Sequence, residues 1–313
     1  MRKAAWVATH LPRSRAFLRE PPDALLPDRR GYLRSMGSLA ARLRESGIRA
    51  PVHHVRHHEA HAACAALVMP DASGAVVTAD GMGEWDTAAL WRVDAGLPTR
   101  LATASYPHSP GKAYAAVTAW LGFRAEADEG KTMGLSAYGD PAHATARFTR
   151  SLVAPDAERL RVDVARFGFP WGEARLYGDA FLDVLGPARR VDEALRDGDA
   201  AAARGIQDAV ETFALAAARR ALAATGASAL GLAGGLFLNC AMNGRLAREL
   251  DAAVHPFPAA GDAGAALGAA ALVHRRATGA PARPLASLRL GTAIEPDDAR
   301  RVLDGAADVE LDD

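Results

Sequence analysis

The residue types best suited to bind a metal ion occur within one short part of the chain. His57 and His61 are four residues apart, and Asp80 follows nineteen residues after His61. On a helix, residues four apart share one face with Cβ atoms about 5–6 Å apart, so two imidazoles can hold one divalent ion at about 2.0–2.1 Å. Asp80 ends an apolar run that predicts a strand, which would carry its carboxylate to the same place. Such mixed ligation suits iron, zinc or manganese, and these residues do not choose among them.

Two plainer interpretations compete with a metal site. Five histidines, at positions 53, 54, 57, 58 and 61, occur within nine residues. Such a segment also fits a solvated helix end, or histidines that are buried in the core with their hydrogen bonds satisfied. A zinc-protease motif is excluded. It requires a histidine three residues after the glutamate that follows the first ligand, whereas the residue three after Glu59 is Ala62.

Two pairs of glycines follow apolar runs and could bring the backbone close to a nucleotide. Gly81 and Gly83 come directly after the predicted strand, where free N–H groups can approach a phosphate, although Asp-Gly is equally a hairpin signal. Gly234 and Gly235 follow the apolar run 229–233. Close packing of a helix on a strand would explain the second pair without any ligand.

A helix predicted after the second pair carries Asn239 and Asn243, four residues apart, which could bond a ribose or a base. No Gly-Lys-Ser/Thr follows, so this is not a Walker loop. Asp262, between two glycines at the start of an Ala-rich helix, is either a fourth metal ligand or a helix cap. Glu129 and Lys131 flank one glycine and place an acid and a base on a predicted loop, which could also be plainly solvated.

The composition limits the function classes. The 313 residues carry 37 basic and 37 acidic side chains, and this balance argues against a nucleic-acid surface. Two cysteines cannot form a disulfide framework, so we expect a reduced, cytoplasmic setting. The uncharged stretch 221–244 is rich in glycine and polar breakers, which favours a buried strand and turn over a membrane span. Residues 4–8 are interpreted as a strand rather than as part of a signal peptide.

Alternating strand and helix patterns predict an α/β fold. Predicted strands cover residues 75–79, 88–93 (the hairpin partner of 75–79), 229–233 and 252–255. Predicted helices cover residues 32–46, 60–68, 111–123, 206–225, 239–250 and 261–276. Residues 129–139 are predicted to be a glycine-punctuated loop, and residues 141–204 give no clear pattern.

Together these segments resemble the O-carbamoyltransferases that modify nodulation factors and antibiotics. The matching stretches occur in the family's order over roughly residues 53–275: HHEAHAACA, ADGMGEWDTAALW, PHSPGKAYAAVTAWLGF, DEGKTMGLSAYG, LAGGLFLNCAMNGRL and PAAGDAGAALGAA. The resemblance implies a two-lobed, actin- and sugar-kinase-like (ribonuclease H-like) ATP-binding core, similar to the domain that forms threonylcarbamoyladenosine in tRNA. The neutral charge and the antibiotic-type signatures disfavour tRNA as the substrate.

The resemblance also implies a reaction. Carbamoyl phosphate and ATP would give carbamoyl adenylate, whose carbamoyl group passes to a hydroxyl of a small molecule or glycoside. It implies an iron ion, with zinc or manganese as alternatives, held by His57, His61, Asp80 and Asp262. The glycines and amide implied to line the adenylate are Gly81, Gly83, Gly234, Gly235, Asn239 and Gly264. Glu129 or His58 would be the general base, and Lys131 would offset charge on the adenylate.

Two departures from the family define the expected domains. Residues 1–275 match the core domain but lack its first strands, and residues 276–313 match a linker and the beginning of a C-terminal adenylate-forming domain. We therefore expect a separate domain to supply the carbamoyl adenylate. The alternative hypothesis is a non-catalytic metal- and nucleotide-binding remnant or scaffold. Neither a nucleic-acid partner nor a membrane partner is expected.

Overall fold

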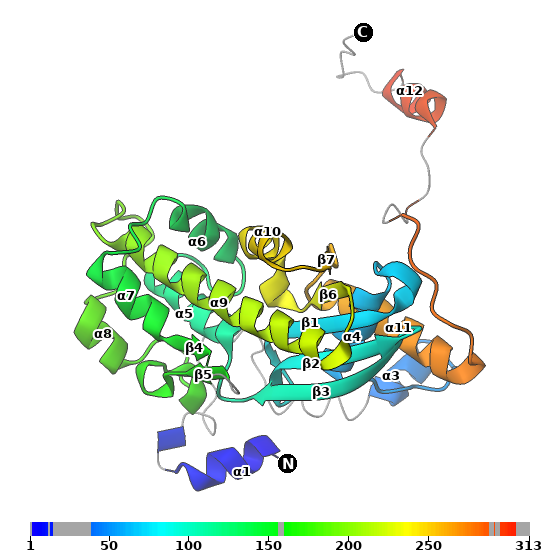
Figure 1. The fold of residues 1–313 in the computed structure, drawn as a ribbon, viewed down its shortest axis with the longest axis horizontal. Helices are drawn as coiled ribbons and strands as arrows, with labels where there is room; N and C mark the ends of the chain where they lie inside the picture. The colour runs from blue at the N-terminus through cyan, green and yellow to red at the C-terminus, as the bar shows by residue number, and fades with distance from the viewer. Residues whose placement is uncertain are drawn as a thin grey trace.

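The computed structural model describes residues 2–11, 13–14, 39–155, 160–287, 291 and 295–304. Its centre is a five-stranded sheet with the strand order β3-β2-β1-β6-β7 (Figure 1). The strands are β1 (Gly74–Gly83), β2 (Asp86–Asp94), β3 (Leu97–Ser105), β6 (Ala229–Ala233) and β7 (Ala253–Pro256). The first three form an antiparallel meander, whereas β6 and β7 run parallel to β1. The four predicted strands of this sheet and the predicted hairpin pairing are confirmed.

Helices cover both faces of the sheet, which confirms the α/β class. The helices that pack on it or border the site are α4 (His57–Ala66), α5 (Pro110–Trp120), α6 (Glu129–Ser136), α9 (Asp199–Thr225), α10 (Cys240–Glu249) and α11 (Asp262–Thr278). Successive side chains of strand β1 point to opposite faces of the sheet, so the strand contributes to the core on both sides. Ala75 and Val77 pack with α5 and α9, whereas Val76 packs with α4 on the opposite face. In Figure 1, α9 accordingly crosses one face of the sheet, and α4 and α11 lie on the other.

The contact between α4 and α11 is unusually close because it uses small residues. A Cβ atom on Gly268 of α11 would lie 2.0 Å from the Ala60 carbonyl oxygen of α4. A Cβ on Gly264 would lie 2.2 Å from the Ala259 carbonyl oxygen and 3.1 Å from the Cys64 sulfur. Larger side chains at these two glycines would push the helices apart. The predicted adenylate residue Gly264 is thus a buried packing position, and the contact brings the start of α11 to the first turn of α4.

The remaining elements are short and lie mainly in the part of the chain that gave no sequence pattern. Their bounds are α1 (Arg2–Thr9), α3 (Leu39–Glu45), η2 (Pro70–Ala72), α7 (Ala144–Ser151), β4 (Val153–Pro155), β5 (Leu160–Val162), η3 (Val164–Arg166), η4 (Phe169–Trp171), α8 (Asp179–Leu185), η5 (Gly235–Leu238) and α12 (Pro296–Asp304). Helix α3 falls within the predicted helix 32–46, whose residues 32–38 lie outside the described chain.

Two predictions about secondary structure were wrong. Residues 4–8, predicted as a strand, belong to helix α1. Its Trp6 stacks on His10, the residue after the helix, and donates its indole N–H to the Pro170 carbonyl. Residues 129–136 of the predicted loop form helix α6. Its two glycines are tolerated because Thr132 and Ser136 are buried one turn apart, and tertiary packing of this kind outweighs a penalty of about 1 kcal/mol per glycine.

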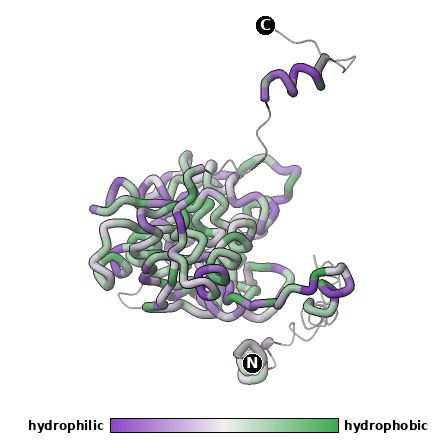
Figure 2. The backbone as a smooth tube through the Cα atoms, turned by 90° about the vertical axis from the view of Figure 1, so that its right-hand side faces the viewer, coloured by the Kyte–Doolittle hydropathy of each residue, from purple (hydrophilic) through white to green (hydrophobic). Residues whose placement is uncertain are grey.

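The distribution of hydropathy follows the layers. Figure 2 shows hydrophobic stretches within the body formed by the sheet and its helices, whereas α12 is strongly hydrophilic. Among the helices of the described chain, none combines the length and apolar character that crossing a membrane requires.

Candidate metal centre

Four side chains with metal-binding groups meet where three elements end or begin. His57 and His61 lie on the first turns of α4, Asp80 lies near the end of β1, and Asp262 is the first residue of α11. One ligand-type atom from each residue lies within 4.8 Å of all the others. The structure therefore brings together all four residues that the sequence resemblance implied as ligands.

The distances fit a single divalent ion. His57 Nε2 and His61 Nε2 are 3.1 Å apart and lie 3.0 and 3.1 Å from Asp80 Oδ2. Asp262 Oδ1 lies 3.5 and 3.6 Å from the two imidazole nitrogens. A tetrahedral ion with ligands at about 2.0–2.1 Å separates its donor atoms by about 3.3–3.4 Å. The two nitrogens and two oxygens thus already surround a volume of the size that such an ion fills.

The charges around this volume suit a cation. Burial opposes ionisation of Asp80, but hydrogen bonds from His57 and His61 and from the Gly81 N–H outweigh it and hold its pKa well below the usual range. The hydrogen bond to Asp80 raises the pKa of His57 despite partial burial. His61 is fully buried, whereas the Asp262 side chain is 79% exposed. The cluster therefore has a buried inner side and an open, acidic outer side.

Glycines of the two predicted nucleotide motifs crowd the ligands themselves. A Cβ on Gly83 would lie 2.3 Å from His57 Cδ2, and a Cβ on Gly235 would lie 3.0 Å from Asp80 Oδ1. Gly234 has a φ of +102°, and a Cβ there would lie 2.2 Å from the Ala79 carbonyl oxygen. The close approach of strand, turn and imidazole accounts for these glycines without any nucleotide.

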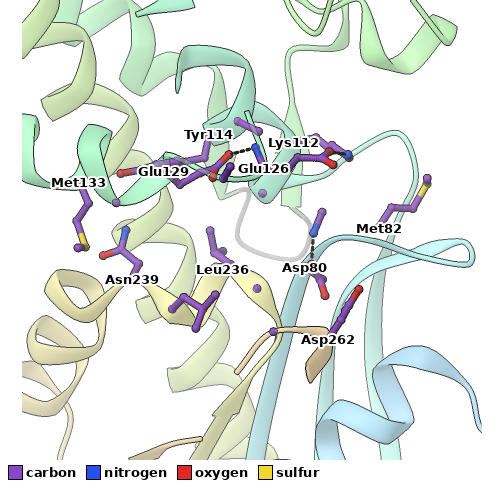
Figure 3. A pocket seen from close by; sticks show the side chains of 18 residues that line it. Asp80, Met82, Lys112, Tyr114, Glu126, Glu129, Met133, Leu236, Asn239 and Asp262 are labelled. Carbon is purple, nitrogen blue, oxygen red and sulfur yellow. Dashed lines mark hydrogen bonds and ion pairs between the residues drawn. The ribbon is translucent and has the colours of Figure 1, made fainter. Parts of the chain in front are cut away.

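A cavity of about 570 Å³ opens beside the cluster. Figure 3 shows Asp80 and Asp262 on one side of it and Asn239 and Met133 on the other. Its walls come from the end of β1, from α5 and α6 with the turn before α6, and from the Gly-Gly turn after β6. Of the predicted adenylate residues, Gly81, Gly235 and Asn239 line it.

Known proteins share this combination of segments. Over residues 28–271 the chain matches the family described as carbamoyltransferase N-terminus. The chain belongs to this carbamoyltransferase family. It is 36% identical over 216 residues to the uncharacterized protein sll1178 of Synechocystis sp., covering 68% of this chain and 35% of that protein.

Two nodulation proteins are also similar to this carbamoyltransferase-family chain. The match to NolNO of Sinorhizobium fredii is 32% identical over 230 residues and covers 70% of this chain and 31% of NolNO. The match to NolO of Bradyrhizobium diazoefficiens is 32% identical over 221 residues and covers 70% of this chain and 38% of NolO. The chain thus spans about a third of the length of the curated relatives that it matches.

The amide of Asn239 is held by a partly buried network that the sequence did not reveal. Gln207 of α9 donates to Asn239 Oδ1 at 3.0 Å and accepts from Asn239 Nδ2 at 2.8 Å. The Tyr114 hydroxyl donates to Gln207 Oε1 at 2.9 Å, and Gln207 Nε2 donates to Glu211 at 2.7 Å. Asn239 Oδ1 also caps α10 at the Met242 N–H. Two polar side chains that line the cavity, Tyr114 and Asn239, are therefore oriented from behind by Gln207.

Only one of the three predicted catalytic residues of this carbamoyltransferase-family chain lines the cavity. Glu129 does so, and its carboxylate accepts the Glu126 N–H. Lys131 is not a lining residue: its side chain is 59% exposed and its ammonium lies 3.3 Å from the Asp128 carboxylate. His58 is buried away from the cavity, between the Thr78 hydroxyl and the Asp86 carbonyl, each 3.0 Å from a ring nitrogen. Burial, with the neighbouring His57, lowers the pKa of His58 to about 4.

Sequence reasoning also missed the basic residue of the cavity. Lys112 lies in the first turn of α5 and lines the wall next to Gly81. The sequence predicted that a helix begins at Pro110-Gly111, but only the fold shows that the start of this helix packs against the end of β1. The sequence gave only a weak indication of the role of Gln207, namely that it is a polar residue next to the apolar stripe of α9.

Proposed function

We propose that this chain takes part in O-carbamoyl transfer, in which a carbamoyl group passes from carbamoyl adenylate to a hydroxyl of a small molecule or glycoside. Family membership supports carbamoyl transfer in general. The observation that carries the finer proposal is the convergence of two imidazoles and two carboxylates at the edge of a cavity that Gly235, in the turn after β6, helps to line. Such a cavity suits a ligand whose reactive end meets a metal and whose other end meets the strand–helix turn.

The donor and acceptor follow from the same family. Carbamoyl phosphate and ATP would be converted into carbamoyl adenylate by a separate adenylate-forming domain. Two relatives are named nodulation proteins, and the small-molecule or glycoside acceptor of this proposal is the one that the resemblance to nodulation-factor and antibiotic carbamoyltransferases implies. The mixed sheet with helices on both faces is compatible with an actin- and sugar-kinase-like (ribonuclease H-like) core, and we retain that topology as part of the proposal.

The metal would be held by His57, His61, Asp80 and Asp262, with iron as the first choice and zinc or manganese as alternatives. Two nitrogen and two oxygen donors suit any of the three. A bound ion would supply Lewis-acid polarisation of the carbamoyl carbonyl or of the phosphate. The buried His61 and the Asp80 carboxylate, held by three hydrogen bonds, would fix the site, and the exposed Asp262 would complete it.

The transfer itself needs a base and an oriented donor. The acceptor oxygen forms a bond to the carbamoyl carbon while the bond from that carbon to the phosphate oxygen breaks. AMP leaves with the electron pair of that bond, and the hydroxyl proton passes to a base. Glu129 is the better candidate for this role because it lines the cavity, whereas His58 does not. A base must reach the proton within hydrogen-bond distance.

Supplying carbamoyl adenylate directly tests the proposal without the adenylate-forming domain. The full chain would be incubated with carbamoyl adenylate, Mn²⁺ and a panel of glycosides, and AMP and carbamoylated products would be measured by mass spectrometry. We expect AMP release above the rate without protein, with transfer to at least one acceptor, and loss of both in His61→Ala. AMP release at the background rate with every acceptor would instead favour the non-catalytic scaffold.

A further inference from the structure

The cavity has an unusual charge balance for a site that is proposed to bind an adenylate. Four carboxylates line it, from Asp80, Glu126, Glu129 and Asp262. Among the described residues, Lys112 is the one basic side chain in its lining. A divalent ion would balance Asp80 and Asp262, which leaves Lys112 as the cation facing two further carboxylates. The affinity of the cavity for an anionic ligand therefore depends strongly on the position of the Lys112 ammonium.

Lys112 is held beside the metal cluster by the backbone. Ser109 caps α5 by accepting the Lys112 N–H at 3.0 Å and donates its hydroxyl proton to the Gly81 carbonyl at 2.6 Å. This pair of bonds ties the first turn of α5 to the residue that follows Asp80. The Lys112 stem packs over Gly81, where an added Cβ would lie 3.4 Å from Lys112 Cε. The position of the side chain relative to Asp80 is thus set by two elements of the fold.

The ammonium of Lys112 has a partner that it can exchange. It pairs with the Glu126 carboxylate, and the two side chains are 24% and 51% exposed. Ion pairs at such exposure contribute little to stability because water screens them. A ligand phosphate could therefore take the place of Glu126 at small cost. Lysine binds phosphates as a compact point charge and needs no fixed bidentate geometry.

We infer that Lys112 is the cation that contacts the phosphate of the adenylate, placing that phosphate between the α5 N-terminal turn and the metal ligands. The inference rests on the proposed function and names a residue for it that the sequence resemblance did not. As AMP leaves, its phosphate gains negative charge, and a preplaced ammonium stabilises that charge. Lys131, to which the resemblance assigned this role, points instead to Asp128.

The inference is tested by comparing binding of AMP with binding of adenosine, since the two ligands differ by the phosphate alone. Isothermal titration would use the full chain with Mn²⁺ present throughout. We expect Lys112→Met to lower the affinity for AMP by roughly 10- to 100-fold, as for loss of a hydrogen bond to a charged group, and to leave adenosine binding unchanged. Lys112→Arg, which retains the charge, should keep most of the preference for AMP.

Two further variants separate this role from a general effect of charge. Lys131→Met tests the role that the resemblance implied, and Arg219→Met removes a cation from an exposed position of α9 that does not line the cavity. Both should keep the wild-type ratio of AMP to adenosine affinity. An unchanged ratio in Lys112→Met, or a ratio lost in Lys131→Met alone, overturns the inference. If the wild-type chain binds neither ligand, the proposed function fails and the inference falls with it.

Discussion

The side-chain amides of Gln207 and Asn239 face each other and exchange two hydrogen bonds, 3.0 and 2.8 Å long. Gln207 is 3% exposed and lies on α9, whereas Asn239 caps α10 and lines the cavity. The pair links the longest helix of the described chain to the turn that bounds the proposed adenylate site. Because Glu211 accepts from Gln207 at 2.7 Å, the orientation of the Gln207 amide is fixed as well.

Gln207→Leu should therefore destabilise the fold as well as loosen the cavity wall. The substitution leaves the Asn239 amide and the Tyr114 hydroxyl without their buried partner, and each such loss costs about 1–3 kcal/mol. We expect the free energy of unfolding, measured by urea denaturation, to fall by about 2–4 kcal/mol. Arg219→Met on an exposed part of the same helix should change it by less than about 0.5 kcal/mol. Equal small effects in both variants would show that the amide pair contributes nothing.

The second prediction concerns metal binding. The wild-type chain should bind one divalent ion, and His61→Ala should lower the affinity at least tenfold because it removes a buried ligand (order of magnitude, from the effect of altering metal ligation). The bound metal would be measured by elemental analysis after dialysis. The thermal midpoint of the wild-type chain should also rise with added metal, since a ligand at a hundred times its Kd stabilises by about 2.7 kcal/mol.

His53→Ala is the matched control for this measurement, because His53 belongs to the same histidine-rich segment but is exposed. It should retain wild-type metal content. Metal retained equally in His61→Ala, or lost equally in His53→Ala, would be incompatible with metal binding by His57, His61, Asp80 and Asp262.

Two glycine substitutions distinguish a steric effect on the metal ligands from a general effect of replacing glycine by alanine. In Gly83→Ala the new methyl group would lie 2.3 Å from His57 Cδ2, so the imidazole must move. We expect metal affinity to fall at least tenfold, on the scale of a disturbed ligand orientation. In Gly134→Ala on α6, the new methyl meets nothing within 4 Å. That variant should bind metal normally and gain up to about 1 kcal/mol of stability. Normal metal binding by Gly83→Ala would disprove the steric argument.

Much of the sheet could be predicted because its central strands contain short apolar runs. Strand β3 could not, since none of its residues is fully buried and they offer no apolar run. Helix α6 could not either, because its glycines predict a loop, whereas the burial of Thr132 and Ser136, which favours the helix, appears only in the fold. In both cases the deciding information is a contact with another element, which local sequence does not contain.

The residues of the candidate site likewise fall into those that local sequence predicts and those that only tertiary contacts bring to the site. His57 and His61 were recognisable because their spacing matches one helix turn, and Asp80 because it ends a strand. The approach of Asp262 depends on the glycine-mediated contact of α4 and α11. From its place at a glycine-flanked helix start, the sequence left Asp262 open as either a metal ligand or a helix cap, and only the family resemblance favoured the ligand. The sequence did not indicate Lys112 as a site residue, because its inferred role depends on the packing of the start of α5 against the end of β1. That the four ligand residues bind a metal stays a prediction.

The two cysteines should differ sharply in reactivity. Cys64 is fully buried beneath α11, and burial raises the pKa of its thiol to about 12. Cys240 is exposed at the start of α10, where its sulfur lies 3.8 Å from the sulfur of Met133, a residue that lines the cavity. Because the thiolate is the reactive form, a thiol reagent at neutral pH should modify one cysteine per native chain and the second only after unfolding. Cys240→Ser should abolish the native reaction.

The same shift gives a dependence of stability on pH. The pKa of Cys64 is raised in the folded chain above its ordinary value of 9.0, so the unfolded chain releases this proton first as the pH rises. The contribution of Cys64 is therefore fully present below pH 9 and declines between about pH 9 and 12. In urea titrations across this range, Cys64→Ala should show a smaller loss of stability with pH than the wild-type chain. Parallel losses would mean that the thiol is accessible to water in the native state, contrary to its burial beneath α11.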